Sequence, residues 1–405
     1  MKPAFRSLAA SLAVLLATNA DAESIALVNA NLFNGVDPAI RENVTVLVRD
    51  GRIERIGDAT TPVPEDYRAI DCEGNYLMPG LFDVHTHIDT LDRARRALES
   101  GVTTVRTASG TAFQDVGLRE LVRAGKLAGP DVIAAGLYVT PDLGDAILAD
   151  PRLVGLADGV DSDADLRLLV NVNVDRGADV IKTRGTQRAG LPDTDPRQQV
   201  YTERQLKVIV DEAARRGVAV MVHAHGDEGA RAAVLAGARS IEHGTYLSEE
   251  TIGLMQERGT YFVPTYVTMD EMNEEQYDYV LRLRGKYMVP QLEKAIRMAH
   301  EAGVRIATGA DNYYDPDSIN RISIEVEQFV RMGMSNFEAL RSATVVAAEL
   351  LQVDDRTGRL VEGYEADMLL VPANPLEEIT ALQDGLLVIS NGIVAVKRIP
   401  FAVTD

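Results

Sequence analysis

The chain has 405 residues, of which 46% are hydrophobic and 25% charged, the composition of a globular protein with room for one large domain or two ordinary ones. Its formal net charge of −20 argues against nucleic acids and membranes as partners, because phosphate-rich surfaces are bound by basic patches. The only cysteine, Cys72, excludes an intramolecular disulfide, so stability has to come from a large core.

The N-terminus contains the three parts of an export signal in order. Lys2 and Arg6 supply the positive segment, residues 8–17 (LAASLAVLLA) are apolar, and residues 20–22 (ADA) match a small-x-small cleavage site. The apolar run is shorter than the roughly 20 residues that a bilayer span needs. We therefore expect residues 1–22 to be a signal peptide and the mature protein to be exported, periplasmic or secreted; a buried N-terminal helix is the alternative.

Both ends of the chain have β character. The stretch VTVLVRDGRIERIG (44–57) alternates apolar and polar residues around Asp50-Gly51, which is a strong signal for a hairpin. After residue 357, GRLVEGYEADMLLVP (358–372) and GLLVISNGIVAVKR (385–398) also read as strands. We expect residues 23–78 and 357–405 to form one small β-sandwich domain from both chain ends.

Between these ends, short apolar strands alternate with helices, which is typical of an α/β fold with a parallel sheet. Glycines recur between a helix and the next strand, where the left-handed conformation closes helices. Thr202 with Gln205 and Ser335 with Glu338 have the spacing of capping boxes. Eight strand-helix units predict a (β/α)8 barrel of the TIM type over residues 79–356. The predicted strands are 81–86, 102–107, 131–137, 179–183, 218–224, 240–243, 261–265 and 304–309.

Residues suited to metal binding follow these strands. In such barrels the active site lies at the carboxyl ends of the strands, and five of the six histidines fall there. Each residue alone has an ordinary explanation, such as a buried core histidine, an ion pair or a helix cap, but their coincidence at one end indicates a metal site. The set is His85, His87, Lys182, His223, His225, His243 and Asp311. Only His300 lies within a predicted helix, where a surface position is expected.

Lys182 is unusual among metal ligands, because an ammonium would be repelled by two cations. Burial and positive neighbours depress the pKa of a lysine, and a neutral amine can take up carbon dioxide to form an anionic carbamate. That carbamate can bridge two divalent metal ions, most simply zinc. One metal would then bind His85, His87 and Asp311, and the other would bind His223 and His243.

At this point the chain resembles the metal-dependent amidohydrolase superfamily, and most of all its imidazolonepropionase-like and prolidase-like branch, with exported carboxypeptidases and ochratoxin-type amidases. The resemblance extends over nearly everything after the signal peptide. It implies a binuclear site with a carbamylated lysine at Lys182 and makes His223, rather than His225, the fifth-strand ligand. The motifs that carry it are MPGLFDVHTH, GVTTVR, GADVIK, VHAHG, SIEHGT, VPT, ATGAD and GYEADMLLV.

The implied activity is hydrolysis of an amide or peptide bond, in an N-acyl amino acid or a dipeptide, by attack of a metal-bridging hydroxide. Asp311 would take the proton, and His225 or Tyr138 would stabilise the oxyanion. Arg184, Arg106 or Arg188 would bind a substrate carboxylate. The branch often carries an aspartate after TTVR and a Gly-Gly-His after strand three, where this chain has Thr107 and TPDLGDA (140–146). The substrate is therefore open, whereas the metal set is complete.

Three alternatives remain at the level of the sequence. A lactonase or phosphotriesterase uses the same metal pair. A mononuclear deaminase is suggested by HGDE (225–228), although Lys182 argues against it. A metal-dependent binding protein without turnover is the third. The expected partner is a small-molecule substrate, and a homo-oligomer is compatible with the sequence.

Overall fold

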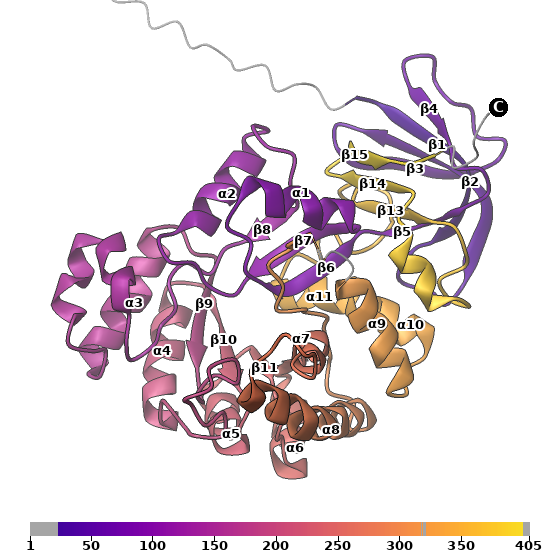
Figure 1. Cartoon of the computed structure of the whole chain (residues 1–405). Helices are drawn as coiled ribbons and strands as arrows, with labels where there is room; N and C mark the ends of the chain where they lie inside the picture. Colours follow the sequence, from indigo (N-terminus) through magenta and orange to yellow (C-terminus); the bar gives the residue numbers. More distant parts are fainter. Residues whose placement is uncertain (1–22, 317, 319–320, 400–405) are drawn as a thin grey trace, which may run out of the picture.

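The computed structural model describes residues 23–316, 318 and 321–399 (Figure 1). The predicted signal peptide lies outside the described residues. Within the described part of the chain, no helix is long and apolar enough to cross a membrane. Cys72 is buried.

Strands from both chain ends form one sheet, in the order β15-β14-β13-β5-β1-β2-β3, with β4 paired to β1. β5 is central to it, because it pairs with β1 on one side and with β13 on the other. That the sheet forms a two-layer sandwich stays a prediction. Its strands are β1 (Ile25–Phe33), β2 (Ile40–Arg49), β3 (Arg52–Asp58), β4 (Arg68–Asp71), β5 (Tyr76–Pro79), β13 (Met368–Val371), β14 (Leu387–Ser390) and β15 (Ile393–Lys397).

The predicted hairpin at Asp50-Gly51 is confirmed. β2 and β3 pair antiparallel up to Arg49 and Arg52, and the two turn residues have φ angles of 50° and 76°. Positive φ at both central residues is what a tight two-residue hairpin turn requires. A side chain at Gly51 would lie 2.8 Å from the carbonyl oxygen of Asn391, so this turn packs closely against the turn between β14 and β15.

Seven of the eight predicted barrel strands are present as parallel strands in two sheets, β6-β7-β8 and β12-β11-β10-β9. The eighth, predicted at 304–309, has a single bridge from Ile306 to Phe262. A bridge between Val139 and Thr183 joins the chain after β8 to β9, and the closed barrel stays a prediction. The strands are β6 (Leu81–Thr86), β7 (Val102–Thr107), β8 (Asp131–Ile133), β9 (Val180–Arg184), β10 (Ala219–Ala224), β11 (Ser240–His243) and β12 (Tyr261–Val263).

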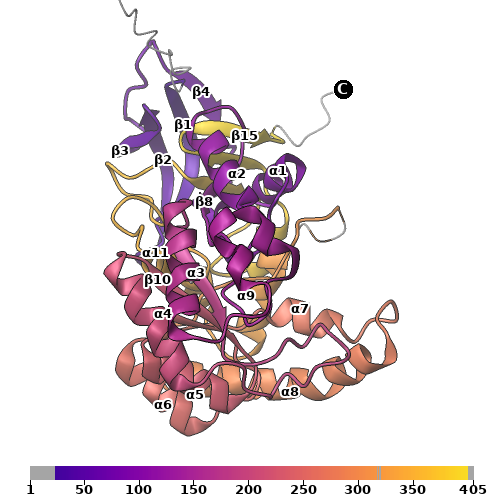
Figure 2. The ribbon, with the colours of Figure 1, turned by 90° about the vertical axis from the view of Figure 1, so that its left-hand side faces the viewer.

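Helices α3 to α6 pack side by side along one flank of these strands (Figure 2). The capping boxes at Thr202 and Ser335 are confirmed. The helices are α1 (Leu91–Glu99), α2 (Gln114–Arg123), α3 (Asp163–Asp175), α4 (Glu203–Arg215), α5 (Asp227–Ala236), α6 (Glu249–Arg258), α7 (Tyr266–Glu271), α8 (Tyr279–Glu301), α9 (Arg321–Arg331), α10 (Asn336–Ser342) and α11 (Val345–Leu351). Short 3₁₀ helices are η1 (Gly144–Ala149), η2 (Pro151–Leu156) and η3 (Ile379–Gln383).

Candidate functional site

A cavity of about 670 Å³ opens at the carboxyl ends of the parallel strands. Side chains from β6, β9, β10, β11 and the segment after residue 309 line it, together with the two loops that follow β8 and β9. All seven residues of the predicted metal set lie in its wall. The same wall holds Tyr138, Arg184 and Arg188.

His243 lies at the middle of the histidine cluster. Its ring centroid is 5.0 Å from that of His85, 4.5 Å from that of His223 and 4.7 Å from that of His225. His243 and Asp311 both have left-handed backbones, with φ of 72° and 48°. A non-glycine residue adopts this conformation only where the surroundings impose it, and such positions gather at functional sites.

The donor atoms form two overlapping groups. His223, His225 and His243 make one group, and His85, His243 and Asp311 the other; in each, the donor atoms lie within 4.8 Å of one another. His87 joins the second, because its Nε2 lies 3.0 Å from Oδ1 of Asp311. Imidazole nitrogens and a carboxylate are the donors that zinc and similar ions prefer, so the residues present fit a metal centre.

Buried neighbours hold the Nδ1 atoms of three of these histidines. His85 Nδ1 lies 2.7 Å from Glu242 Oε2, and His225 Nδ1 lies 2.9 Å from Thr245 Oγ1. His243 Nδ1 lies 2.7 Å from Thr265 Oγ1, whose own hydrogen is donated to the carbonyl of Pro264. His243 therefore donates from Nδ1, which leaves its Nε2 lone pair free for a ligand.

Lys182 is 2% exposed, and its Nζ has no hydrogen-bond partner among the described residues. Burial lowers the pKa of this lysine to about 8, although the nearby carboxylates of Glu242 and Asp311 raise it. A buried ammonium without a partner is costly, so an atom in this position calls for a neutralising modification or ligand.

Asp311 carries the negative charge of the cluster. Burial alone would raise the pKa of this carboxyl, but His85, His87 and Lys182 hold it well below its usual range. A carboxylate that stays ionised suits a metal ligand and a proton acceptor.

The structure corrects the prediction for Arg106. Its side chain is 2% exposed and does not line the cavity. The guanidinium donates instead to Val84 O, Ser240 Oγ and Glu242 Oε1, at 2.6, 3.2 and 2.9 Å. These hydrogen bonds hold the guanidinium inside the fold, beneath the histidines, so Arg106 is not available to a substrate.

Glu242 is not among the residues predicted from the sequence, although its place next to the predicted ligand His243, in the strand SIEH, was a visible signal. It is fully buried and bridges Arg106 and His85. Burial by itself would raise the pKa of Glu242, but Arg106 and His85 outweigh it and lower the pKa to about 2.

Arg184 and Arg188 lie where the sequence places them, at the end of β9 and in the loop after it. Arg184 contacts Thr140 Oγ1, and its Cζ is 5.1 Å from the ring centroid of Tyr138. The buried Nε of Arg184 and the buried hydroxyl of Tyr138 have no hydrogen-bond partner among the described residues. Apolar side chains form part of the remaining wall: Leu143, Ala146, Met269, Met272 and Leu281.

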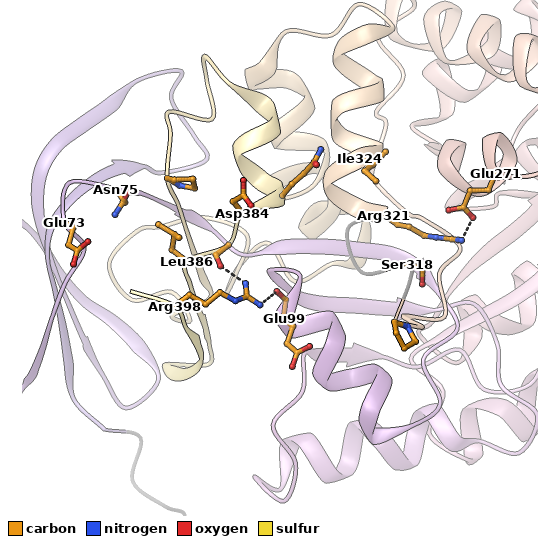
Figure 3. A pocket seen from close by; sticks show the side chains of 14 residues that line it. Glu73, Asn75, Glu99, Glu271, Ser318, Arg321, Ile324, Asp384, Leu386 and Arg398 are labelled. Atoms are coloured by element: carbon orange, nitrogen blue, oxygen red, sulfur yellow. Dashed lines mark hydrogen bonds and ion pairs between the residues drawn. The ribbon is translucent and has the colours of Figure 1, made fainter. Parts of the chain in front are cut away.

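A second cavity, of about 1000 Å³, lies between the sheet built from both chain ends and helix α9 (Figure 3). Its wall contains no histidine, and its arginines are already engaged: Arg321 with Glu271, and Arg398 with the carbonyl oxygens of Gly385 and Glu99. The smaller cavity is therefore the candidate site.

Comparison with known proteins gives one consistent result. Residues 76–394 match the Amidohydrolase family. The chain is 28% identical over 425 residues to ochratoxinase from Aspergillus niger, and this alignment covers 91% of this chain and 86% of that protein. It is 26% identical over 393 residues to imidazolonepropionase from Kosmotoga olearia, covering 87% of this chain and 90% of that one. The crystal structure of a Xaa-Pro dipeptidase with bound methionine in its active site has a TM-score of 0.82 and 27% identity, covering 92% of this chain and 99% of that chain.

Proposed function

The chain belongs to the amidohydrolase family, and from that premise we propose that it is a binuclear metal-dependent hydrolase that cleaves the amide bond of an N-acyl amino acid or a dipeptide. Its relatives are enzymes that act on C–N bonds, among them an ochratoxinase and a Xaa-Pro dipeptidase. The observation that carries the proposal is the gathering of five histidines, Asp311 and Lys182 in one cavity, where Lys182 is buried with no hydrogen-bond partner among the described residues.

The residues divide into two ligand sets. His85, His87 and Asp311 would hold one divalent ion, and His223 and His243 the other, with zinc the simplest choice. Lys182, carbamylated by carbon dioxide, would reach both ions. Its burial and lowered pKa favour the neutral amine that this reaction needs. When bound, the metal pair supplies a Lewis acid for the scissile carbonyl and lowers the pKa of water towards neutrality.

The protein's own groups would complete the reaction. Asp311 accepts the proton of the attacking water and passes it to the leaving nitrogen. The oxyanion would accept from the ring of His225 or from the hydroxyl of Tyr138, which is buried in the cavity wall and has no hydrogen-bond partner within the described part of the chain. These assignments follow from the positions of the side chains around the cavity.

Arg184 and Arg188 would bind the carboxylate of the leaving amino acid. Lys182 and Arg184 are two residues apart on β9, so their side chains point to the same face, with Arg184 nearer the mouth. A carboxylate beyond the scissile amide would meet Arg184 while the amide lies beside Lys182. The apolar residues Leu143, Met269 and Met272 would receive the acyl side of the substrate.

Finer features of the whole chain are proposed with this function. Residues 79–356 would form a closed barrel, supported by the hydrogen bonds from Phe262 N to Arg305 O and from Val84 N to Thr308 O, which place the segment 304–309 between β12 and β6. Residues 23–78 and 357–405 would form the second domain, a small β-sandwich. Residues 1–22 would direct export to the periplasm or medium.

The test begins with metal content per chain, by elemental analysis, and the native mass of the peptide that contains Lys182. Two metals and a carbon dioxide adduct support the proposal. Turnover is then measured on N-acyl amino acids, dipeptides, lactones and phosphotriesters. Preference for the last two would favour the lactonase or phosphotriesterase alternative. One metal with an unmodified Lys182 would contradict the binuclear site and direct the search to deaminase substrates.

A further inference from the structure

Three buried residues form a chain beneath the histidine cluster. Arg106 on β7 donates to Glu242 Oε1 on β11, and Glu242 Oε2 lies 2.7 Å from His85 Nδ1 on β6. Arg106, Glu242 and His85 are 2%, 0% and 2% exposed. Three separate strands therefore place a charged pair behind one histidine of the candidate metal centre.

The two carboxylate oxygens of Glu242 have different hydrogen-bond partners. Oε1 accepts from Arg106 Nη2 at 2.9 Å and from Ser240 Oγ at 2.5 Å. Oε2 has His85 Nδ1 as its hydrogen-bond partner. The guanidinium of Arg106 is itself held by Val84 O and Ser240 Oγ, so neither member of the pair can turn away from the other.

A buried ion pair is seldom the most stable filling for an interior, since apolar residues of similar volume are often as good or better. The arrangement does have a chemical use. A carboxylate that accepts from Nδ1 keeps the ring proton on that atom, fixes the ring orientation and makes the opposite nitrogen a stronger ligand.

We propose that Glu242 is a positioning residue for the metal centre, which reserves Nε2 of His85 for the metal, and that Arg106 holds Glu242 in place for this task. The inference rests on the proposed metal-dependent function. The proposal also distinguishes the two ligand sets by the hydrogen-bond partners of their histidines. His85 has a charged acceptor at Nδ1, whereas His243 has only the hydroxyl of Thr265. The ion held by His85, His87 and Asp311 would therefore be the one whose affinity depends on Glu242.

The competing explanation is that Glu242 only neutralises Arg106. The substitution Glu242→Gln separates the two, because an amide that turns its NH₂ group to His85 would donate to Nδ1 and move the ring proton to Nε2. The double variant R106M/E242Q removes the buried charges together and so restores any stability lost through an unpaired arginine.

Zinc affinity is measured for each purified protein by competition with a chromogenic chelator, alongside the thermal midpoint. We expect E242Q and R106M/E242Q to bind one of the two ions about 10- to 100-fold more weakly than the unmodified protein. The double variant should melt close to the unmodified protein. A double variant that binds both ions with unchanged affinity would overturn the proposal and leave Glu242 as a counterion for Arg106.

Asp179→Asn is the matched control. Asp179 pairs with Arg119 at 2.5 Å, at the amino end of β9 and away from the cavity. This variant loses an arginine–carboxylate pair that is less buried than Arg106–Glu242, so a lower melting temperature with unchanged zinc affinity is expected. Equal loss of zinc affinity in D179N would show that the assay reports general destabilisation, and would count against the proposal.

A second measurement requires no change at Glu242. In metal-free protein with ¹⁵N-labelled histidine, the signals of the six rings can be compared with those of His85→Gln to identify His85. A neutral ring with its proton on Nδ1 is expected, and a proton on Nε2 would refute the inference. If the unmodified protein binds no metal at all, the proposed function fails; if it binds two ions and E242Q does likewise with equal affinity, only this inference fails.

Discussion

Lys182 and Arg184 approach the same aromatic ring from one strand. Lys182 Nζ lies 5.8 Å and Arg184 Cζ 5.1 Å from the ring centroid of Tyr138. Two cations two residues apart on β9 therefore share one face, one deep in the cavity and one nearer its mouth. Under the proposed function Lys182 becomes an anionic carbamate, whereas Arg184 keeps its positive charge and binds the substrate.

Replacing Lys182 tests the inner position. Lys182→Arg keeps a positive charge but cannot form a carbamate, so we expect the metal content to fall from two ions to one or fewer. The turnover number should fall by about a thousandfold, or ~4 kcal/mol in activation free energy. Elemental analysis and kinetics on the best N-acyl amino acid check this. An active Lys182→Arg enzyme with two metals would contradict the role given to Lys182.

Arg184→Met tests the outer position. Loss of a charge-assisted bond to a substrate carboxylate should raise KM by about 10- to 100-fold. The same substrate with its carboxylate converted to an amide serves as the control, and its kinetics should be nearly equal in the two enzymes. If both substrates suffer alike, Arg184 shapes the cavity and does not recognise charge.

Arg284 on α8 clamps the loop that carries Arg188. Its guanidinium donates to Ala189 O, Leu191 O and Pro192 O at 2.5, 2.6 and 3.1 Å, and it contacts Thr194 O as well. Arg284→Met leaves these carbonyls without their shared donor, so faster hydrogen exchange in residues 188–194 and a higher KM are expected. Exposed Arg282, two residues earlier on the same helix, provides the control Arg282→Met. Similar exchange in both variants would show that the clamp is not what orders the loop.

Asp367 gives a pH dependence that is separate from the metal site. Burial raises its pKa to about 7, from 3.8. Between these values the folded state holds a proton that the unfolded state has lost. The free energy of unfolding should therefore fall as pH rises through this range, by up to about 1.4 kcal/mol per unit.

Asp367→Asn removes this contribution while an amide can still accept from Asn391 N and donate to Thr357 Oγ1. Urea unfolding at several pH values from 4 to 8 checks the prediction: the difference in stability between variant and unmodified protein should change between pH 4 and about pH 7 and level off above it. Parallel curves would mean that Asp367 is ionised in the folded protein at all these pH values.

The sequence was sufficient to predict where the candidate metal ligands meet, for a general reason. Parallel strands end at one edge of their sheet, so histidines placed at strand ends, such as His85 and His243, come together whatever the loops do. Most strand positions followed from apolar runs and from the glycines before them. The segment 304–309 was predicted as a full strand, but only Ile306 forms a bridge.

Other features depend on side chains from separate strands, which no local pattern specifies. Arg106 was predicted to bind substrate, but its long side chain lies inside the fold, where Ser240 and Glu242 on β11 accept its hydrogen bonds. His243 and its partner Thr265 both have left-handed backbones, a conformation that is uncommon outside glycine and unusual above all for a β-branched residue such as Thr265.

The sheet built from both chain ends has a consequence for synthesis. Pro79 pairs with Met368, and Gly80 alone separates β5 from β6, the strand that carries His85. During translation β5 can find β1 early, but its other edge stays open until residues 80–367 have left the ribosome. An unpaired inner strand is a target for wrong pairing. The strand β5, which leads directly into the strand of His85, therefore gains its second neighbour only near the end of synthesis, and a pause or truncation before β13 would leave β5 paired on one side only.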